Sequence, residues 1–302
     1  MKEIDVRFSY SSIGFPHRAF TWSNEHFIEW AKTTGYSSAE FLPFRNASTE
    51  VLIKNVNVIS SVDFIKSGHV VYNPYATVWS VINKQTDPLR KNVPFGLYNL
   101  AFVEKKNAQT VLNKLENNLK DFYVVTYPYE VNGKRPYGEY KNPVVQTHPA
   151  VFNDENSADE LIKLVKQGKY SGVAWDTFHA LETTQDGIKP FRNWRVSLHK
   201  LLEANVIKEI HIQAGRIREK YSPVPDMSWL KAMTGENPKY NNELGQMIRI
   251  VKEYNPLIPF VIEINTGGLI KAGLLDNKTE SYADISKIQQ IHSQLIDYIK
   301  RG

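Results

Sequence analysis

The chain has no cysteine among its 302 residues, which excludes disulfide bonds, thiolate zinc sites and cysteine nucleophiles. It has no apolar run long enough to span a bilayer, and residues 1–5 lack the pattern of a signal peptide, so we expect a cytoplasmic protein with no membrane partner. No block of five or six like charges and no Pro-, Gly- or Ser-rich linker interrupts the sequence. These absences favour one domain over residues 1–302.

The overall composition is that of an ordinary globular protein with a sizeable core, at 42% hydrophobic and 23% charged residues. The net charge of +5 favours anionic ligands such as phosphates. Nucleic acid is not an expected partner, because the positive charges are not clustered. Aromatic residues make up 12% of the chain, including 16 Tyr. They are compatible with ring platforms for sugars and equally with large core and surface rings.

Short apolar runs of strand type alternate with segments of helical periodicity along the whole chain. Strands are predicted at 4–8, 38–44, 69–75, 122–127, 143–147, 172–176, 209–212 and 259–264. Helices are predicted at 21–34, 107–119, 157–168, 191–204, 241–254 and 282–300, with two short helical stretches within 48–68. Eight such units predict an α/β fold, a single (β/α)8 TIM barrel. The segment 76–106 is irregular, and 129–142 reads as a loop or hairpin in place of the helix after strand four.

One stretch combines a strand with metal-binding residue types. The apolar run that ends in Trp175 is followed at once by Asp176, and His179 comes three residues later. In a barrel of alternating strands and helices, residues at the carboxyl ends of the strands face the active-site mouth. A carboxylate and an imidazole released together there suit a divalent metal ion. Taken alone, a single buried histidine is more often a satisfied core residue.

Other strand ends carry similar residues. Glu263 interrupts the apolar run 260–264, and a buried carboxylate is costly unless it is paired or metal-bound. An ion pair with Arg7 in the first strand is the structural alternative for Glu263. His211 lies in a predicted strand, His148 lies just beyond one, and His69 lies at the predicted start of one.

Four segments together resemble the xylose isomerase-like superfamily of TIM barrels, which includes sugar isomerases and epimerases and the endonuclease IV branch of DNA repair enzymes. The matching segments are Gly-Tyr-Ser-Ser-Ala-Glu-Phe at 35–41, Trp-Asp-Thr-Phe-His at 175–179, Glu-Ile-His-Ile at 209–212 and Val-Ile-Glu-Ile at 261–264. Their order and spacing cover most of the chain.

The resemblance implies one divalent metal ion (Mn, Co, Zn or Mg) held by Asp176, His211 and Glu263. His179 would be a further ligand or a residue that contacts the substrate. The family's fourth ligand is a glutamate at the end of strand five, where this chain has Gln146. A glutamine can offer its carbonyl oxygen to a metal ion, but it cannot act as a base.

This departure bears on the reaction. In the epimerase branch, two carboxylates exchange a proton on a carbon next to a carbonyl, through an enediolate that the metal stabilises. Here Glu263 is the remaining carboxylate of that kind, and His179 or His148 is the candidate for the second catalytic group. The endonuclease IV branch needs further His and Asp ligands after strand seven, which residues 211–216 do not supply. A three-metal nuclease is therefore disfavoured.

Residues for substrate binding are expected at the same mouth. Arg216 follows strand seven and is the candidate for an oxyanion or phosphate contact, although it also fits a solvated basic loop. Trp175 and His69 are the other predicted substrate contacts. The glycines of residues 266–268 are a candidate phosphate site or a simple turn.

The leading hypothesis is a metal-dependent isomerase or epimerase of a sugar, sugar phosphate or related polyhydroxy carbonyl compound. The alternatives are a metal-dependent hydrolase or lyase, in which the metal activates water, and a barrel that has lost catalysis and acts as a binding protein. The expected partner is a small molecule, and a homo-oligomer is compatible with the sequence.

Overall fold

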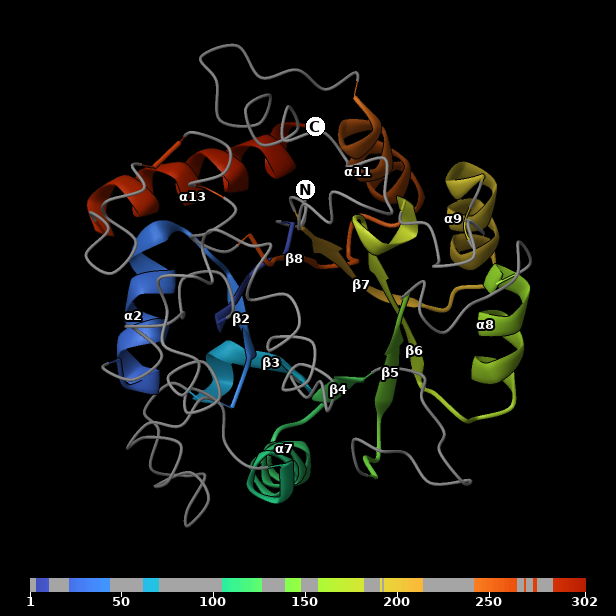
Figure 1. Ribbon diagram of the computed structural model, residues 1–302, viewed down its shortest axis with the longest axis horizontal. Coiled ribbons are helices and arrows are strands. Elements are labelled where there is room, and N and C mark those ends of the chain that lie inside the picture. The colour runs from blue at the N-terminus through green and yellow to red at the C-terminus, as the bar shows by residue number, and fades with distance from the viewer. Residues whose placement is uncertain are drawn as a thin grey trace, which may run out of the picture.

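Eight parallel strands close into a barrel in chain order in the computed structural model of the protein (Figure 1). The strands are β1 (Val6–Ser9), β2 (Ser38–Phe41), β3 (Ile65–His69), β4 (Tyr123–Thr126), β5 (Pro143–Gln146), β6 (Gly172–Asp176), β7 (Ile207–Ile212) and β8 (Phe260–Ile262). The barrel closes where β8 pairs with β1, with Val6 opposite Phe260 and Phe8 opposite Ile262. The predicted α/β TIM-type barrel is therefore confirmed.

The structure describes residues 4–10, 22–43, 62–70, 105–126, 139–147, 157–181, 191, 193–213, 242–264, 269, 274–275 and 285–302. Most of the segment predicted to be irregular, 76–106, lies outside these residues. Of the predicted loop or hairpin at 129–142, only 139–142 is described, and these four residues form neither helix nor strand. No helix in the described part of the chain is long and apolar enough to cross a membrane.

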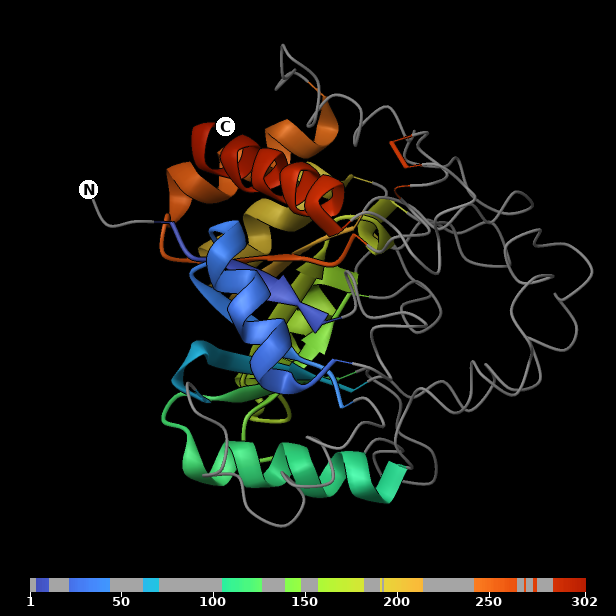
Figure 2. The same cartoon turned by 90° about the vertical axis from the view of Figure 1, so that its left-hand side faces the viewer.

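Helices surround the barrel in Figure 1, and α7 and α13 lie on opposite sides of it in both views (Figures 1 and 2). Within the described residues the α-helices are α2 (Asn24–Thr34), α7 (Lys105–Asn118), α8 (Ser157–Lys166), α9 (Trp194–Glu203), α11 (Glu243–Tyr254) and α13 (Ile285–Arg301). Two short 3-10 turns, η3 (Val62–Phe64) and η5 (His179–Leu181), flank strands β3 and β6. Helix α13 packs against α2, and α9 packs against both α8 and α11.

Helix α2 shows how local sequence sets the boundaries of an element. The side chain of Ser23 accepts a hydrogen bond from the backbone N–H of His26, as the predicted N-cap should. Gly35 ends the helix at φ 102°, a left-handed conformation that favours glycine. The helix thus begins at Asn24, three residues after the predicted start at 21, because the cap residue itself is not helical.

Strand three begins four residues earlier than predicted and ends at His69, so the predicted start of the strand at His69 is wrong. Gly68 looked like the end of a helical stretch, but it lies inside β3. A Cβ atom at Gly68 would lie 2.5 Å from Leu112 Cδ2 and 3.0 Å from Phe122 Cζ. The glycine is therefore needed where α7 approaches the strand closely. The correction moves His69 to the carboxyl end of β3, where it faces the barrel mouth.

The barrel strands have two buried faces, one toward the helices and one toward the inside of the barrel. Their outward side chains, such as Phe8, Phe41 and Trp175, join the helices in one large hydrophobic cluster. Inside the barrel, a smaller apolar cluster contains Val125, Val144 and Ala174. The described strands also bury many polar side chains: Arg7, Ser9, Glu40, Ser67, His69, Gln146, Asp176, Glu209 and His211. TIM barrels ordinarily fill the barrel interior with branched apolar residues, so these polar side chains need an explanation.

Candidate metal centre

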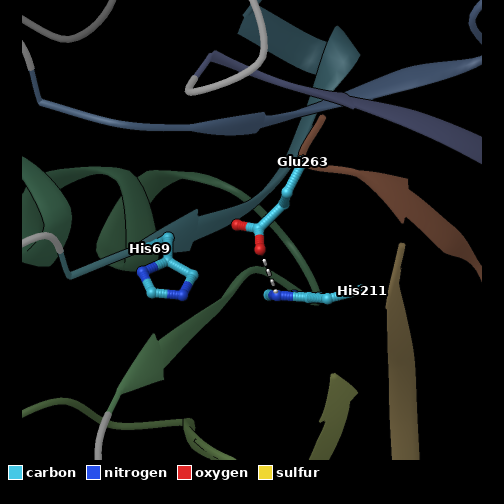
Figure 3. A group of neighbouring side chains, drawn as sticks. All are labelled: His69, His211 and Glu263. Carbon is cyan, nitrogen blue, oxygen red and sulfur yellow. Dashed lines mark ion pairs between the residues drawn. The ribbon is translucent and has the colours of Figure 1, made fainter. Parts of the chain in front are cut away.

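Three side chains converge at the carboxyl ends of β3, β7 and β8. His69, His211 and Glu263, here called the mouth cluster, each offer one ligand atom, and these atoms all lie within 4.8 Å of one another. Figure 3 shows the three side chains directed toward one another, with the ion pair between His211 and Glu263. His211 Nδ1 lies 3.2 Å from Glu263 Oε2. Two imidazoles and a carboxylate in this arrangement form a suitable ligand set for a divalent metal ion.

Gln146 and Asp176 border the mouth cluster from β5 and β6. Gln146 Nε2 donates a 2.8 Å hydrogen bond to Asp176 Oδ2 and lies 3.4 Å from His211 Nδ1. Its other amide atom, Oε1, lies 3.2 Å from His69 Nε2. The glutamine therefore connects the predicted ligand Asp176 to the mouth cluster. Four strands and the residue after β8 thus bring all the predicted metal ligands, together with His69, to one place.

Asp176 also fixes the turn that follows β6. Its Oδ1 accepts hydrogen bonds from the backbone N–H groups of Phe178 (2.9 Å) and His179 (2.8 Å), at the start of η5. Burial raises the pKa of Asp176, and the nearby His179 partly opposes this effect. His179 Nε2 lies 3.9 Å from Asp176 Oδ2, and the side chain is 15% exposed. His179 is thus beside the candidate ligands, at the more open edge of the site.

Below the mouth cluster, a second set of residues surrounds a buried carboxylate. Glu209 Oε1 accepts a 2.9 Å hydrogen bond from His211 Nε2. Glu209 Oε2 accepts hydrogen bonds from the hydroxyl groups of Tyr123 (2.7 Å) and Ser67 (3.2 Å) and from Arg7 Nη1 (3.3 Å). We call Arg7, Ser67, Tyr123 and Glu209 the floor group. The charge of Glu209 is balanced inside the barrel, and its bonding partners hold its pKa below the ordinary value against the effect of burial.

A fourth carboxyl group, Glu40, lies beside this set with incomplete hydrogen bonding. It is 0% exposed, and its Oε1 accepts a 3.0 Å hydrogen bond from Ser9. Its Oε2 lies 3.5 Å from His211 Nε2 but has no hydrogen-bond partner among the described residues, because that ring N–H points to Glu209. Burial raises the pKa of Glu40 well above the ordinary value, and the neighbouring carboxylates reinforce this shift. Glu40 is therefore more readily protonated than an ordinary glutamate.

The carboxylates determine the charge of His211. Burial alone lowers a histidine pKa, but Glu263 and Glu40 outweigh that effect and raise the pKa of His211 well above its ordinary value. In turn, His211 is the main reason why the pKa of Glu263 is held low despite burial. His69 behaves in the opposite way, because burial lowers its pKa and keeps the ring neutral at neutral pH. The mouth cluster therefore offers one ionised carboxylate and one neutral imidazole.

The structural alternative for Glu263, an ion pair with Arg7, is wrong. Arg7 pairs instead with Asp5 (2.9 Å) and Glu209 (3.3 Å). Glu263 receives a hydrogen bond of 2.5 Å from Gln213 Nε2 and the ion pair with His211. Within the described ranges, no lysine or arginine contacts Glu263.

The remaining predicted site residues lie apart from the cluster or outside the described residues. Trp175 is 0% exposed and packs edge-on against Phe191, with ring centroids 5.5 Å apart, in the layer between strands and helices. It does not point into the mouth. His148, Arg216 and residues 266–268 lie outside the described residues.

Glu209 and Glu40 received no role in the sequence analysis, although both stand in the segments that carry the family resemblance. The available signal was the two-residue period of a strand. Glu209 precedes His211 by two positions and so shares its face, and Glu40 pairs in register with Ser67 on the neighbouring strand. Because neither position ends its strand, the focus on strand ends missed both residues.

Comparison with known proteins adds little to this geometry. No family model matches the chain, and no curated protein matches it. One similar solved structure, described as "The crystal structure of AsfvAP:AG", has 13% sequence identity and a TM-score of 0.45, with 99% of each chain covered. The TIM-type fold rests on the strand order and closure of the barrel described above.

Proposed function

We propose that the chain is a single-domain, xylose isomerase-like barrel that holds one divalent metal ion at the mouth cluster. Its reaction is the isomerisation or epimerisation of a sugar, sugar phosphate or related polyhydroxy carbonyl compound. The observation that carries the proposal is the convergence of His69, His211 and Glu263 at the ends of β3, β7 and β8. The four segments that resemble the superfamily support the same reading.

The donor set fits a borderline metal ion such as zinc, cobalt or manganese. His69 is neutral and Glu263 is ionised, so both are in the protonation state that metal binding requires. Gln146 Oε1 and Asp176 would complete the shell; in support, the hydrogen bonds of Gln146 link Asp176 Oδ2 to His69 Nε2. His211 Nδ1 would exchange its proton for the metal ion, which supplies the positive charge that Glu263 otherwise receives from the ring.

The chain's own residues provide two sites for moving a proton. A bound metal ion would polarise the substrate carbonyl and so acidify the neighbouring carbon. Glu263, from the end of β8, is an ionised carboxylate on one side of His211. His179, after β6, is partly exposed and lies next to Asp176. Removal of a proton by one group and its return by the other would complete an isomerisation or epimerisation.

The ligand types favour a second candidate. Two histidines and one carboxylate are the ligand set of many catalytic zinc sites that activate water for hydrolysis. The glutamine at position 146 is compatible with this chemistry, since a hydrolase needs one base where an epimerase uses two. The second candidate is therefore a metal-dependent hydrolase on the same barrel.

Metal binding and proton exchange test the proposal. Purified protein should contain or take up about one divalent ion per chain, and added zinc, cobalt or manganese should raise its melting temperature. Incubation with a panel of ketoses and aldoses in deuterium oxide should then introduce deuterium at the carbon next to the carbonyl, detected by NMR. A protein that neither binds a metal ion nor shifts in melting temperature contradicts both candidates.

The substrate panel separates the remaining possibilities. Turnover of an ester or phosphodiester without deuterium exchange would favour the hydrolase. Cleavage of DNA at an abasic site would contradict a small-molecule substrate. Tight binding of a metal ion and a sugar with neither reaction would identify a barrel that has kept its ligands and lost catalysis.

A further inference from the structure

The two ring nitrogens of His211 face different surroundings. Nδ1 lies 3.2 Å from Glu263 Oε2 in the mouth cluster, whereas Nε2 donates its hydrogen to Glu209 Oε1 at 2.9 Å. The ring is 0% exposed. An imidazole can bind a metal ion through one nitrogen while the other donates a hydrogen bond that fixes its orientation. The contact with Glu209 therefore determines which nitrogen is presented at the mouth.

Glu209 is itself held from the opposite wall of the barrel. Its second oxygen receives hydrogen bonds from Tyr123 on β4, Ser67 on β3 and Arg7 on β1. Arg7 Nη1 also donates a 2.6 Å hydrogen bond to the hydroxyl oxygen of Tyr123, so the donors are linked to one another. Side chains from three strands thus hold the carboxylate of Glu209 on β7 and prevent it from rotating freely.

We propose that Glu209 is a positioning residue for the candidate metal centre. It holds the ring of His211 so that Nδ1 faces His69 and Glu263, and Arg7 and Tyr123 hold Glu209. Glu209 does not touch the substrate in this scheme and acts only through His211. The inference rests on the proposed metal site, but the orientation of the ring can be tested without any metal ion.

The same geometry excludes a second ion at the floor. Glu40, Glu209 and His211 also offer ligand atoms within 4.8 Å of one another. However, His211 Nε2 already donates its hydrogen to Glu209, and the Arg7 guanidinium lies 3.3 Å from the same carboxylate. A second cation would meet the repulsion of this fixed positive charge. We therefore infer one ion per chain.

Three variants test the role of Glu209. Glu209→Gln removes the charge and keeps the shape, and Tyr123→Phe removes the 2.7 Å hydrogen bond that holds Glu209. Glu116→Gln is the matched control: Glu116 is also a buried carboxylate, but it lies on α7 and accepts hydrogen bonds from the backbone N–H groups of Lys141 and Asn142. Zinc affinity and stoichiometry are measured by calorimetry, and the electronic spectrum of the cobalt form reports the ligand geometry.

The expected result is graded. Glu209→Gln should weaken zinc binding by about 10- to 100-fold, as is typical for the loss of a carboxylate behind a histidine ligand, and should change the cobalt spectrum. Tyr123→Phe should change both in the same direction by less. Glu116→Gln should lower the melting temperature but leave zinc affinity and the cobalt spectrum unaltered. Unchanged affinity and spectrum in Glu209→Gln would overturn the proposal.

Two further measurements keep the outcomes distinct. A wild-type stoichiometry of two ions, reduced to one in Glu40→Gln, would overturn the single-ion inference. If the wild type binds no zinc or cobalt, the proposed function fails, and crystal structures of the metal-free variants then decide the positioning role. A displaced His211 ring in Glu209→Gln and Tyr123→Phe supports it, and a ring that keeps its 3.2 Å contact with Glu263 refutes it.

Discussion

Two fully buried histidines in this protein have opposite electrostatic surroundings. His211 lies inside the barrel among carboxylates, and His292 lies on α13, where it packs edge-on against Trp30 of α2 at 5.3 Å and shares a hydrogen bond with Tyr36. Both rings are 0% exposed. Burial lowers the pKa of His292 to about 3, whereas the carboxylates raise the pKa of His211 well above its ordinary value.

The difference shows that burial alone does not indicate what a histidine does. His292 is neutral and its Nδ1 contacts one phenol hydroxyl, while its Nε2 has no hydrogen-bond partner in the part of the chain that the structure describes. It is a packing residue between α2 and α13. His211 contacts Glu263 through Nδ1 and Glu209 through Nε2. Burying these charged side chains costs free energy, which is offset only because they pair with one another. A charged network of this kind in a barrel interior is the better indicator of a functional site.

The largest expected effect is on zinc affinity, which should depend on His211 and not on His292. His211→Gln should abolish measurable zinc binding, because it removes a proposed ligand from the mouth cluster. His292→Gln is a matched change at a fully buried ring and should bind zinc as tightly as the wild type. Calorimetric titration of both variants measures the contrast. Equal loss of binding in the two variants would show that damage to the fold, and not ligand removal, is responsible.

The next effect concerns stability and compares the charged interior with the helix layer. Arg7→Met leaves Glu209 buried without its cation and should cost about 3–5 kcal/mol of unfolding free energy. Tyr36→Phe removes one neutral hydrogen bond to His292 and should cost about 1–3 kcal/mol. Urea denaturation of both variants gives the two values. A cost for Arg7→Met no greater than that for Tyr36→Phe would mean that the floor group contributes little to the stability of the barrel.

The pH dependence of stability sharpens the comparison further. The pKa of His292 is lowered from 6.5 to about 3 on folding, so below pH 6.5 the unfolded chain binds a proton that the folded chain does not. Stability should therefore fall as the pH decreases, by up to about 1.4 kcal/mol per pH unit from this residue. His292→Gln should flatten the curve between pH 6.5 and 4.5. The opposite sign applies to His211, whose raised pKa contributes stability at low pH that is lost as the pH rises through the folded value.

The smallest expected effect tests Gln146, which stands where the superfamily has a glutamate. Gln146→Glu should destabilise the metal-free protein by about 1–3 kcal/mol, because the 2.8 Å hydrogen bond to Asp176 becomes a contact between two carboxyl groups. Zinc should more than restore this loss, since a carboxylate ligand replaces an amide. Melting temperatures with and without zinc measure the change. A variant that is destabilised equally in both conditions would place Gln146 outside the metal shell.

Much of the barrel could be predicted from sequence because its elements carry local signals. Ser23 and Gly35 bound α2 through capping chemistry that needs no tertiary contact, and Gly168, at φ 72°, ends the turn after α8 in the same way. Strand three could not be placed, because Gly68 is explained only by the approach of Leu112 from α7. Local patterns do not contain that contact.

The residues of the candidate site also differ in whether local sequence signals were enough to identify them. Strand-end positions singled out Asp176 and Glu263, and the family resemblance added His211 as a ligand. In the structure His211 and Glu263 lie together, and Gln146 connects Asp176 to them. His69 was predicted to contact the substrate and not to bind the metal ion, and the misplaced strand put it at the start of strand three and not at its carboxyl end. Glu209 was missed, since its importance depends on Arg7 and Tyr123 reaching it across the barrel from strands far away in sequence.

The close approach at Gly68 has a consequence for how related sequences can vary. The residue next to it in the chain is His69, so a side chain at position 68 would push against Leu112 and shift the strand end that carries a candidate ligand. Positions 68 and 112 should therefore change together among homologues, with a larger residue at 68 accepted only beside a smaller one at 112. The candidate metal centre would thus constrain Leu112, a residue of a helix outside the barrel that contacts none of the candidate ligands directly through its own polar atoms.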